Sequence, residues 1–283
     1  MSQDPDKLIA QPGVLRQAYS MSSGDDFHAR FLLQICQIRD CVVPLEERQK
    51  YDKSYHPIHQ NLTEAKFVKE QCETLIAKHT ETIKSGLDGK YHGHQIDIIN
   101  PIDDQLNIFF KDFFIRGAIA CNSLISHTRY LGYNVGFLFA ENEKKYRQGL
   151  INFPLKQDDD RFKILSQMIS GHKSAWYVQF RDLRDAIEHQ GWALPAIHYR
   201  LNEEGKVEII LPSFGTQTLL EILMICWENL TNFCEEILVY VMSLQLKDDQ
   251  MMVQIKPEHR EPILPVRYAV RHRDFPEAKY SCG

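Results

Sequence analysis

The clearest signal in this 283-residue chain is the hexapeptide Arg184-Asp185-Ala186-Ile187-Glu188-His189, which ends two residues before Gly191. Upstream of it, apolar residues recur at helical spacing: Trp176, Phe180, Leu183 and Ile187. They predict a helix that begins near residue 172 and stops at the glycine. We therefore expect an arginine and a histidine at the end of one rigid helix, as a fixed cation and a group that titrates near neutral pH.

The spacing of the charged residues predicts which of them share a side of this helix. Arg181, Asp185 and His189 follow one another at intervals of four, and so do Arg184 and Glu188. Both rows lie on the flank opposite the apolar residues. Ion pairs between Arg181 and Asp185 and between Arg184 and Glu188 are expected, and such surface pairs stabilise a helix by only about 0.3–0.5 kcal/mol.

The elements that follow the motif are also visible in the sequence. Two β-rich runs, 196–201 and 207–211, flank a polar turn and predict a hairpin. A long helix is predicted over 216–246. Polar residues interrupt its apolar pattern, so we expect a helix with a solvated stripe and no membrane span: Glu221, Glu228, Asn229, Asn232, Glu235 and Glu236.

The rest of the chain is predicted to be mainly helical. A polar leader, 1–22, is expected to be partly ordered at best, and 23–283 is expected to form a single helical-bundle domain. Further helices are predicted over 25–43, 63–85, 103–130 and 158–169. The helix over 103–130 is apolar nearly all round, Ile108 and Ile119 included, which predicts a central, buried position.

Other segments are less regular. Residues 44–62 contain Pro44 and Pro57 and are predicted to be a loop. Residues 140–154 form a polar span. The segment 91–100 is open between a strand and an irregular crossing, and short strands are predicted over 252–255 and 266–270.

Composition limits the classes of function. The hydrophobic content of 43% and the charged content of 25% are ordinary for a soluble globular protein. A net charge of −5 argues against a generally basic, nucleic-acid-coating surface but leaves room for a small positive cleft. The seven scattered cysteines contain no CxxC pair, which favours a reducing, cytoplasmic compartment.

Neither a metal nor a cofactor is expected. Two pairs of histidines, His56 with His59 and His92 with His94, are interpreted as exposed loop residues. Zinc binding at the second pair would need a third ligand from elsewhere, such as Asp97 or Asp103, and nothing in the spacing demands one.

A helical bundle with Arg-polar-x-x-x-His near the end of a helix, then a short insertion and a long final helix, resembles the HEPN superfamily (higher eukaryote and prokaryote nucleotide-binding domains). The matching positions are Arg184, Asp185 and His189, within a region of about 100–246. The resemblance implies an up-and-down helical bundle, often a homodimer. For active members it implies metal-independent endoribonuclease activity in a prokaryotic defence, toxin or stress setting. The implied partners are RNA or a nucleotide, with an antitoxin or regulatory protein.

The resemblance also implies roles for the residues. His189 would act as general base or acid at the ribose 2′-OH or the leaving 5′-oxygen. Arg184 would bind the scissile phosphate, and Asp185 would orient His189 or a neighbouring guanidinium. Arg181 and Trp192 are candidate substrate-binding residues, Trp192 through stacking on a base or, alternatively, as a rim aromatic of the core. The other hypotheses are an inactive module that binds nucleotide or a protein partner, and a structural bundle.

Overall fold

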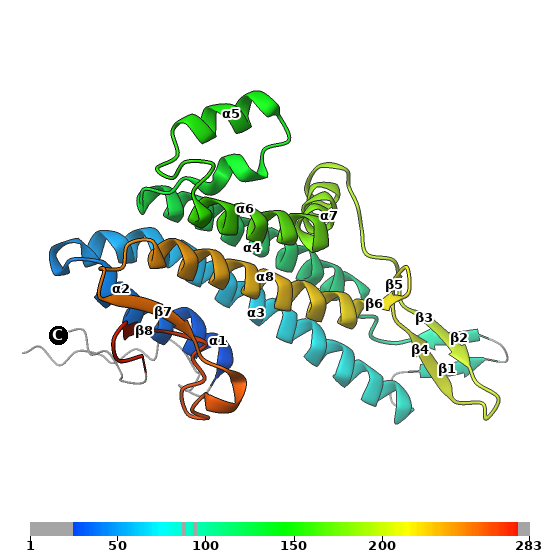
Figure 1. Ribbon diagram of the computed structural model, residues 1–283. Helices are drawn as coiled ribbons and strands as arrows, with labels where there is room; N and C mark the ends of the chain where they lie inside the picture. The colour runs from blue at the N-terminus through cyan, green and yellow to red at the C-terminus, as the bar shows by residue number, and fades with distance from the viewer. Residues whose placement is uncertain (1–24, 87–88, 93–94, 277–283) are drawn as a thin grey trace, which may run out of the picture.

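A computed structural model describes residues 25–86, 89–92 and 95–276, so the predicted leader lies outside the described residues. The chain is mainly helical, as predicted, and its strands form small antiparallel pairs (Figure 1).

The α-helices are α1 (Asp26–His28), α2 (Ile35–Val42), α3 (Arg48–Lys84), α4 (Asp103–Tyr130), α5 (Glu143–Ile151), α6 (Asp160–His172), α7 (Val178–His189) and α8 (Leu219–Ser243). Two π-helical segments, η1 (Ala29–Gln34) and η4 (Lys173–Tyr177), join α1 to α2 and α6 to α7. Single 3-10 turns are η2 (Leu45–Glu47), η3 (Val135–Phe139) and η5 (Pro257–His259).

The strands pair with their neighbours in sequence. They are β1 (Gly89–His92), β2 (Gln95–Ile98), β3 (His198–Leu201), β4 (Val207–Ile210), β5 (Ser213–Phe214), β6 (Gln217–Thr218), β7 (Gln250–Gln254) and β8 (Tyr268–His272). The predicted hairpin is confirmed as β3–β4, with Arg200 opposite Glu208. The segment 91–100 belongs to the β1–β2 hairpin, and the two predicted C-terminal strands pair as β7–β8.

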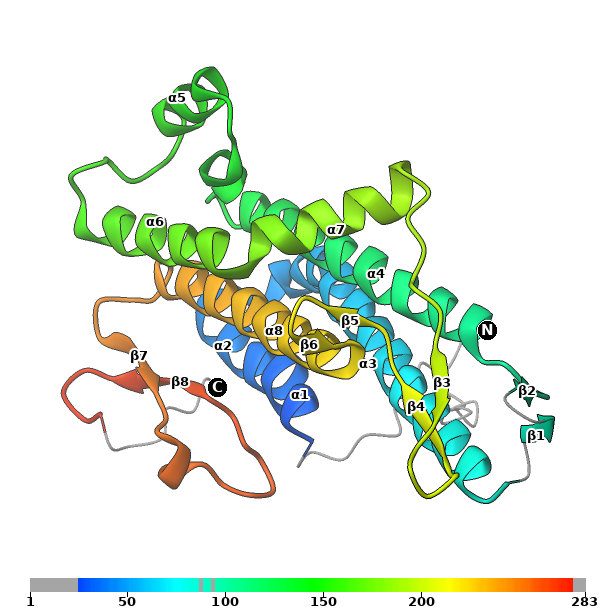
Figure 2. The same ribbon diagram turned by 90° about the vertical axis from the view of Figure 1, so that its right-hand side faces the viewer.

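The centre of the molecule is the long antiparallel pair of α3 and α4, with α8 packed along it (Figures 1 and 2). Phe110, Phe113 and Phe114 of α4 and Phe233 of α8 are fully buried there. Phe162 and Ile169 of α6 join the same core. In the described residues no helix is both long enough and apolar enough to cross a membrane.

The predicted loop over 44–62 is wrong for most of its length, because α3 runs unbroken through Pro57. A proline inside a helix costs about 3 kcal/mol. Against this cost, Tyr51, Tyr55, Ile58 and Leu62 are buried on one face of the same stretch. Burying each such side chain stabilises the fold by roughly 1.5–3 kcal/mol, so tertiary packing outweighs the local penalty.

Three more predictions need correction. His59, interpreted from the sequence as an exposed loop residue, is buried within α3, whereas His94 lies outside the described residues. The polar span over 140–154 contains α5, whose first turn is capped by Asn142 through bonds from the N–H groups of Lys144 and Lys145. The helix over 103–130 is central but not buried all round, because Ile108 and Ile119 are exposed.

The packing of Gly117 fixes α7 against the core. A Cβ at this position of α4 would lie 2.7 Å from Cζ of Phe180 and 3.0 Å from Cδ2 of Leu230. The missing side chain therefore allows α7 and α8 to approach α4 closely. Because α6, η4 and α7 are continuous, this contact positions the helix that carries the hexapeptide.

One cysteine departs from the pattern expected of a protein in a reducing compartment. Cys41 is disulfide-bonded. The other described cysteines are free: Cys36, Cys72, Cys121, Cys226 and Cys234.

Candidate functional site

The hexapeptide occupies the last two turns of α7, as predicted, and His189 is the final helical residue. Gly191 has φ of 66°, a left-handed conformation that glycine adopts without strain and that ends the helix. The N–H groups of Gln190 and Trp192 both donate to the carbonyl oxygen of Ala186, at 3.1 and 3.3 Å. The end of the helix is therefore closed by backbone bonds, which fixes the direction of the side chains on its last turn.

Arg184 is held by two carboxylates of its own helix. Its Nη1 donates to Oδ1 of Asp185 at 2.8 Å, and its Nη2 lies 2.6 Å from Oε2 of Glu188. Its side chain is 26% exposed, and its Nε has no hydrogen-bond partner among the described residues. The predicted Arg184–Glu188 pair is confirmed. Asp185 was predicted to orient either His189 or a neighbouring guanidinium, and the structure pairs it with the guanidinium of Arg184.

His189 is open to solvent beside this cluster. Its side chain is 67% exposed, and its Nε2 lies 3.6 Å from Oε2 of Glu188. The same oxygen that binds Arg184 is therefore the anionic atom nearest to the imidazole. An exposed imidazole can exchange protons with a bound substrate or with water, which is what a general acid or base requires.

Arg181 is not paired with Asp185, contrary to the prediction. Its Nη1 lies 2.8 Å from Oε1 of Glu141 and its Nη2 lies 3.1 Å from Oδ1 of Asp182. The hydrogen bond to Glu141, with that to Asp182, raises the pKa of the Arg181 guanidinium. Arg181 thus ties the first turn of α7 to the segment before α5.

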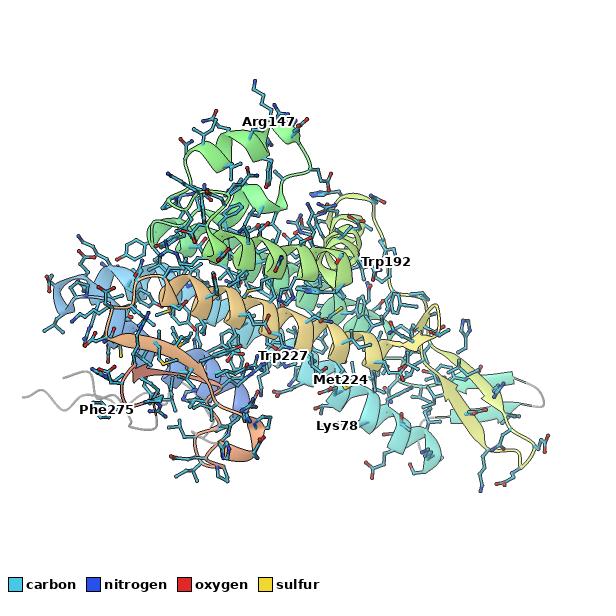
Figure 3. The ribbon with its side chains drawn as sticks, in the orientation of Figure 1. Lys78, Arg147, Trp192, Met224, Trp227 and Phe275 are labelled. Carbon is cyan, nitrogen blue, oxygen red and sulfur yellow. The ribbon has the colours of Figure 1, made fainter. Side chains whose placement is uncertain are left out.

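Trp192 is half-buried beyond the helix end (Figure 3). Its ring stacks on Phe214, with centroids 6.0 Å apart, and packs against Phe110 at 5.6 Å. These contacts fit the alternative that Trp192 is a rim aromatic, and they fix its ring in place.

The sequence predicted one further carboxylate of this cluster, Glu188, and missed another, Glu141. The spacing of four residues predicted the pair of Glu188 with Arg184, and the structure adds that the same carboxylate also lies next to His189. Glu141 gave no signal, because it is 40 residues away from Arg181 in the chain. With Asp182 and Asp185, the carboxylates around the two arginines outnumber them, so the described residues of a single chain form no positive patch along α7.

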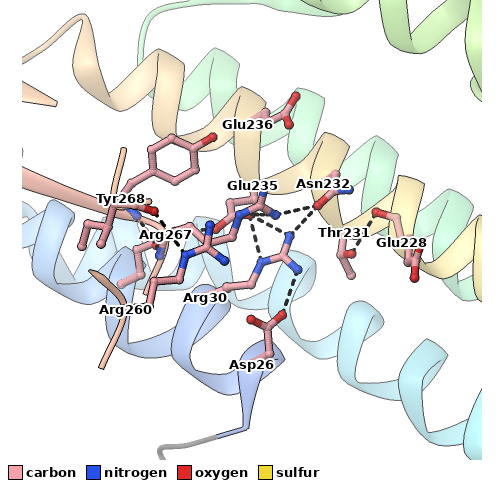
Figure 4. A network of polar contacts seen from close by, with 12 residues as sticks. Asp26, Arg30, Glu228, Thr231, Asn232, Glu235, Glu236, Arg260, Arg267 and Tyr268 are labelled. Atoms are coloured by element: carbon pink, nitrogen blue, oxygen red, sulfur yellow. Dashed lines mark hydrogen bonds and ion pairs between the residues drawn. The ribbon is translucent and has the colours of Figure 1, made fainter. Parts of the chain in front are cut away.

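A second cluster of arginines and carboxylates lies inside the molecule (Figure 4). Glu235 of α8 is completely buried, although the sequence placed it on a solvated stripe, and that prediction is wrong. Its Oε2 lies 2.7 Å from Nη2 of Arg30 and 3.0 Å from Nη1 of Arg267. Its Oε1 accepts a bond of 2.8 Å from the amide of Gln34.

Gln34 extends this network to the C-terminal strands. Its side-chain oxygen accepts the backbone N–H groups of Arg267 and Tyr268, at 2.6 and 2.7 Å. The cluster therefore joins η1, α8 and β8. Because Arg30, Gln34 and Glu235 are buried and bonded to one another within the chain, the role of the cluster is structural.

Across the described ranges no group of three or more histidine, cysteine, aspartate or glutamate side chains is placed to hold a metal ion. Comparison with protein-family models, curated proteins and solved structures finds no match to this chain. The chemistry of the residues themselves is therefore the basis for a functional assignment.

Proposed function

We propose that this protein is a metal-independent endoribonuclease of the HEPN type, with an up-and-down helical bundle, that cleaves RNA through attack of a ribose 2′-OH on the adjacent phosphodiester. One observation carries the proposal. Arg184 and His189 lie on the closed last turns of α7 and are both within 4 Å of a single oxygen, Oε2 of Glu188. Because one carboxylate oxygen of Glu188 lies beside both Arg184 and His189, an oxygen of a phosphate group can take the same position.

In this proposal His189 supplies the proton transfer. It takes the proton of the 2′-OH as that oxygen forms a bond to phosphorus, or it gives a proton to the 5′-oxygen as the P–O5′ bond breaks. The products are a 2′,3′-cyclic phosphate and a 5′-hydroxyl. The exposure of His189 supports this role, because its ring can reach a substrate without a change in the core.

Arg184 binds the scissile phosphate and stabilises the extra negative charge of the transition state. Its planar guanidinium suits two oxygens of one phosphate. Asp185 stays as the residue that orients the guanidinium, through the 2.8 Å bond to Nη1, while the phosphate displaces Glu188. Arg181 and Trp192 flank the site as proposed substrate-binding residues.

The excess of carboxylates around α7 is the reason to propose a homodimer. A lone chain offers RNA little attraction at this end of the helix. In a dimer, two Arg184–His189 pairs would face one another across a cleft and concentrate their positive charge. An antitoxin or regulatory protein that covers this cleft, in a cytoplasmic setting, belongs to the same proposal.

The test is incubation of the protein with single-stranded RNA in an excess of EDTA. We expect fragments that carry a 2′,3′-cyclic phosphate and a 5′-hydroxyl, and no cleavage of DNA of the same sequence. Fragments that form only when a divalent cation is supplied would contradict the proposal, as would intact RNA.

A second candidate is an inactive module of the same type that binds a nucleotide. The observation in its favour is that both terminal nitrogens of Arg184 are bound to carboxylates, which occupy the positions that the phosphate oxygens of a nucleotide would take. Such a module leaves RNA intact, and its melting temperature rises with added nucleotide. The rise is expected to be lost in Arg184→Ala and kept in Arg147→Ala, which removes an exposed arginine with an i,i+4 glutamate partner on α5. A chain that shows neither cleavage nor this shift is a structural bundle.

A further inference from the structure

A pocket of about 780 Å³ lies between α2, the strands β7 and β8, and the segment 255–264. These elements are at the opposite end of the molecule from α7 (Figures 1 and 2). The volume is within the range of roughly 300–1,000 Å³ that small-molecule sites occupy. The pocket shares no residue with the cluster around Arg184.

One part of the pocket is apolar. Val253 and Ala269 line it and are directly opposite one another in the β7–β8 register. Ile38 of α2 and Val266, both buried, complete this part. These side chains form a surface on which the flat or apolar body of a ligand can be excluded from water.

The other part of the pocket is basic. Lys256, His259, Arg260 and Arg271 line it. Arg271 follows Ala269 by two residues on β8, so it shares the face of the strand that carries the apolar lining. The protein therefore presents cations next to an apolar surface in one concave site.

These cations are unusual for this molecule because they are not neutralised. Within the described part of the chain, nearly every arginine is in an ion pair with a carboxylate, and the exceptions are Arg129, Arg260, Arg271 and Arg273. Two of these exceptions line this pocket. Arg260 donates through Nε to the carbonyl oxygen of Ile255 at 3.2 Å, which fixes its stem and leaves its terminal nitrogens for a ligand.

The pocket also contains the carboxylates Asp40 and Glu261. Oδ1 of Asp40 lies 2.8 Å from Nη2 of Arg39 and 3.2 Å from Nη1 of Arg48, so its charge is already offset from outside the pocket. Lys256, Arg260 and Arg271 then outweigh Glu261. In a chain with a net charge of −5, this is a local positive field inside a cavity.

We propose that this pocket binds a small organic phosphate. The apolar body of the ligand packs on Val253, Ala269 and Ile38. The phosphate binds Arg260 and Arg271, whose guanidinium groups match its geometry and remain charged at every physiological pH.

The test is titration calorimetry of the full chain with 1-naphthyl phosphate, with 1-naphthol and inorganic phosphate as the two half-ligands. We expect 1-naphthyl phosphate to bind at least about tenfold more tightly than either half. The variant R260Q/R271Q is expected to weaken that binding by at least about tenfold, since it removes two charge-assisted contacts. The matched variant Arg129→Gln, which removes an unpaired arginine outside the pocket, should bind as the wild type does. Absence of binding, or equal binding by both variants, would overturn the proposal.

Hydrogen exchange of the unaltered protein provides a test that does not depend on a variant. Saturating 1-naphthyl phosphate is expected to slow exchange in 250–272 and to leave 178–189 unchanged. Protection in 178–189 alone would place the ligand at the other cluster and overturn the assignment. The outcome is independent of the proposed ribonuclease, because the two sites have no residue in common.

Discussion

The two arginine–carboxylate clusters differ in burial and hardly at all in geometry. The shortest N–O distance is 2.7 Å between Arg30 and Glu235 and 2.6 Å between Arg184 and Glu188. The side chains are 9% and 0% exposed in the first pair, against 26% and 24% in the second. Distance alone therefore does not distinguish an ion pair that holds the fold from one that can take part in binding. The exposure of the two side chains to water distinguishes them.

The physical reason is the cost of an unpaired charge. Removing one partner from a buried pair leaves a charge that water cannot reach, whereas solvent replaces a lost partner at the surface. Arg30, Gln34 and Arg267 are thus committed to Glu235 and join three segments that are far apart in sequence. The partners of Arg184 can exchange with a ligand at little cost.

The largest effect on stability is expected from Glu235→Gln in the buried cluster. The change leaves Arg30 and Arg267 without their shared carboxylate, so we expect the free energy of unfolding to fall by about 3–5 kcal/mol in urea denaturation. Glu236→Gln is the matched control, because Glu236 lies on the next position of α8, is partly exposed and binds His172. A similar loss in both variants would contradict the structural role given to the buried cluster.

Acid should destabilise the fold through its buried histidines. Burial lowers the pKa of His127 to about 4, and that of His59 likewise, against about 6.5 in an unfolded chain. The unfolded state then binds more protons below pH 6.5, so stability is fully present above that pH and is lost as the pH falls towards 4. The contribution of His127 is on the order of 3 kcal/mol.

Urea denaturation between pH 7 and pH 4 measures this effect. In His127→Leu the fall in stability across this range should be smaller, because one buried titrating group is gone. His198→Leu, which removes an exposed histidine of β3, should reproduce the wild-type slope. Equal slopes in all three proteins would show that His127 does not titrate as expected.

Gly117 tests whether α7 depends on close packing. In Gly117→Ala the new Cβ would overlap the buried ring of Phe180, so we expect a loss of about 1–3 kcal/mol in unfolding free energy. Gly171→Ala is the matched change in α6, where a Cβ meets nothing within 4 Å. There the helix should gain about 0.5–1 kcal/mol. Opposite signs from two identical substitutions are the expected outcome, and equal signs would contradict the packing described.

The smallest effect on stability is expected at the exposed cluster. Arg184→Ala should change the free energy of unfolding by less than about 1 kcal/mol, as should Arg147→Ala, which removes a more exposed i,i+4 pair. If the proposed function is right, the two variants separate in RNA cleavage, where Arg184→Ala loses about 10²–10³-fold. A large loss of stability in Arg184→Ala alone would place this arginine with the structural cluster.

The sequence predicted those parts of the molecule whose signals are local. The stop of α7 at Gly191, the β3–β4 hairpin and the long α8 each depend on residues within one segment. The course of α3 through Pro57 could not be predicted locally, because its support comes from the core on the other side of Tyr51 and Ile58.

The same limit applied to the charged clusters. The pair of Arg184 and Glu188 follows from helical spacing alone. Glu235 looked like a surface residue because its main partner, Arg30, is 205 residues away in the chain. Only the tertiary fold brings those two charges together, so the burial of Glu235 has no signature in the sequence around it.

The most direct test of the central claim is the rate of RNA cleavage in EDTA by His189→Ala relative to His198→Ala. Both variants remove one exposed histidine, so both should fold and melt as the wild type does. We expect a rate about 10²–10⁴-fold lower in His189→Ala and an unchanged rate in His198→Ala. Equal rates in the two variants would contradict the assignment of the chemistry to the end of α7.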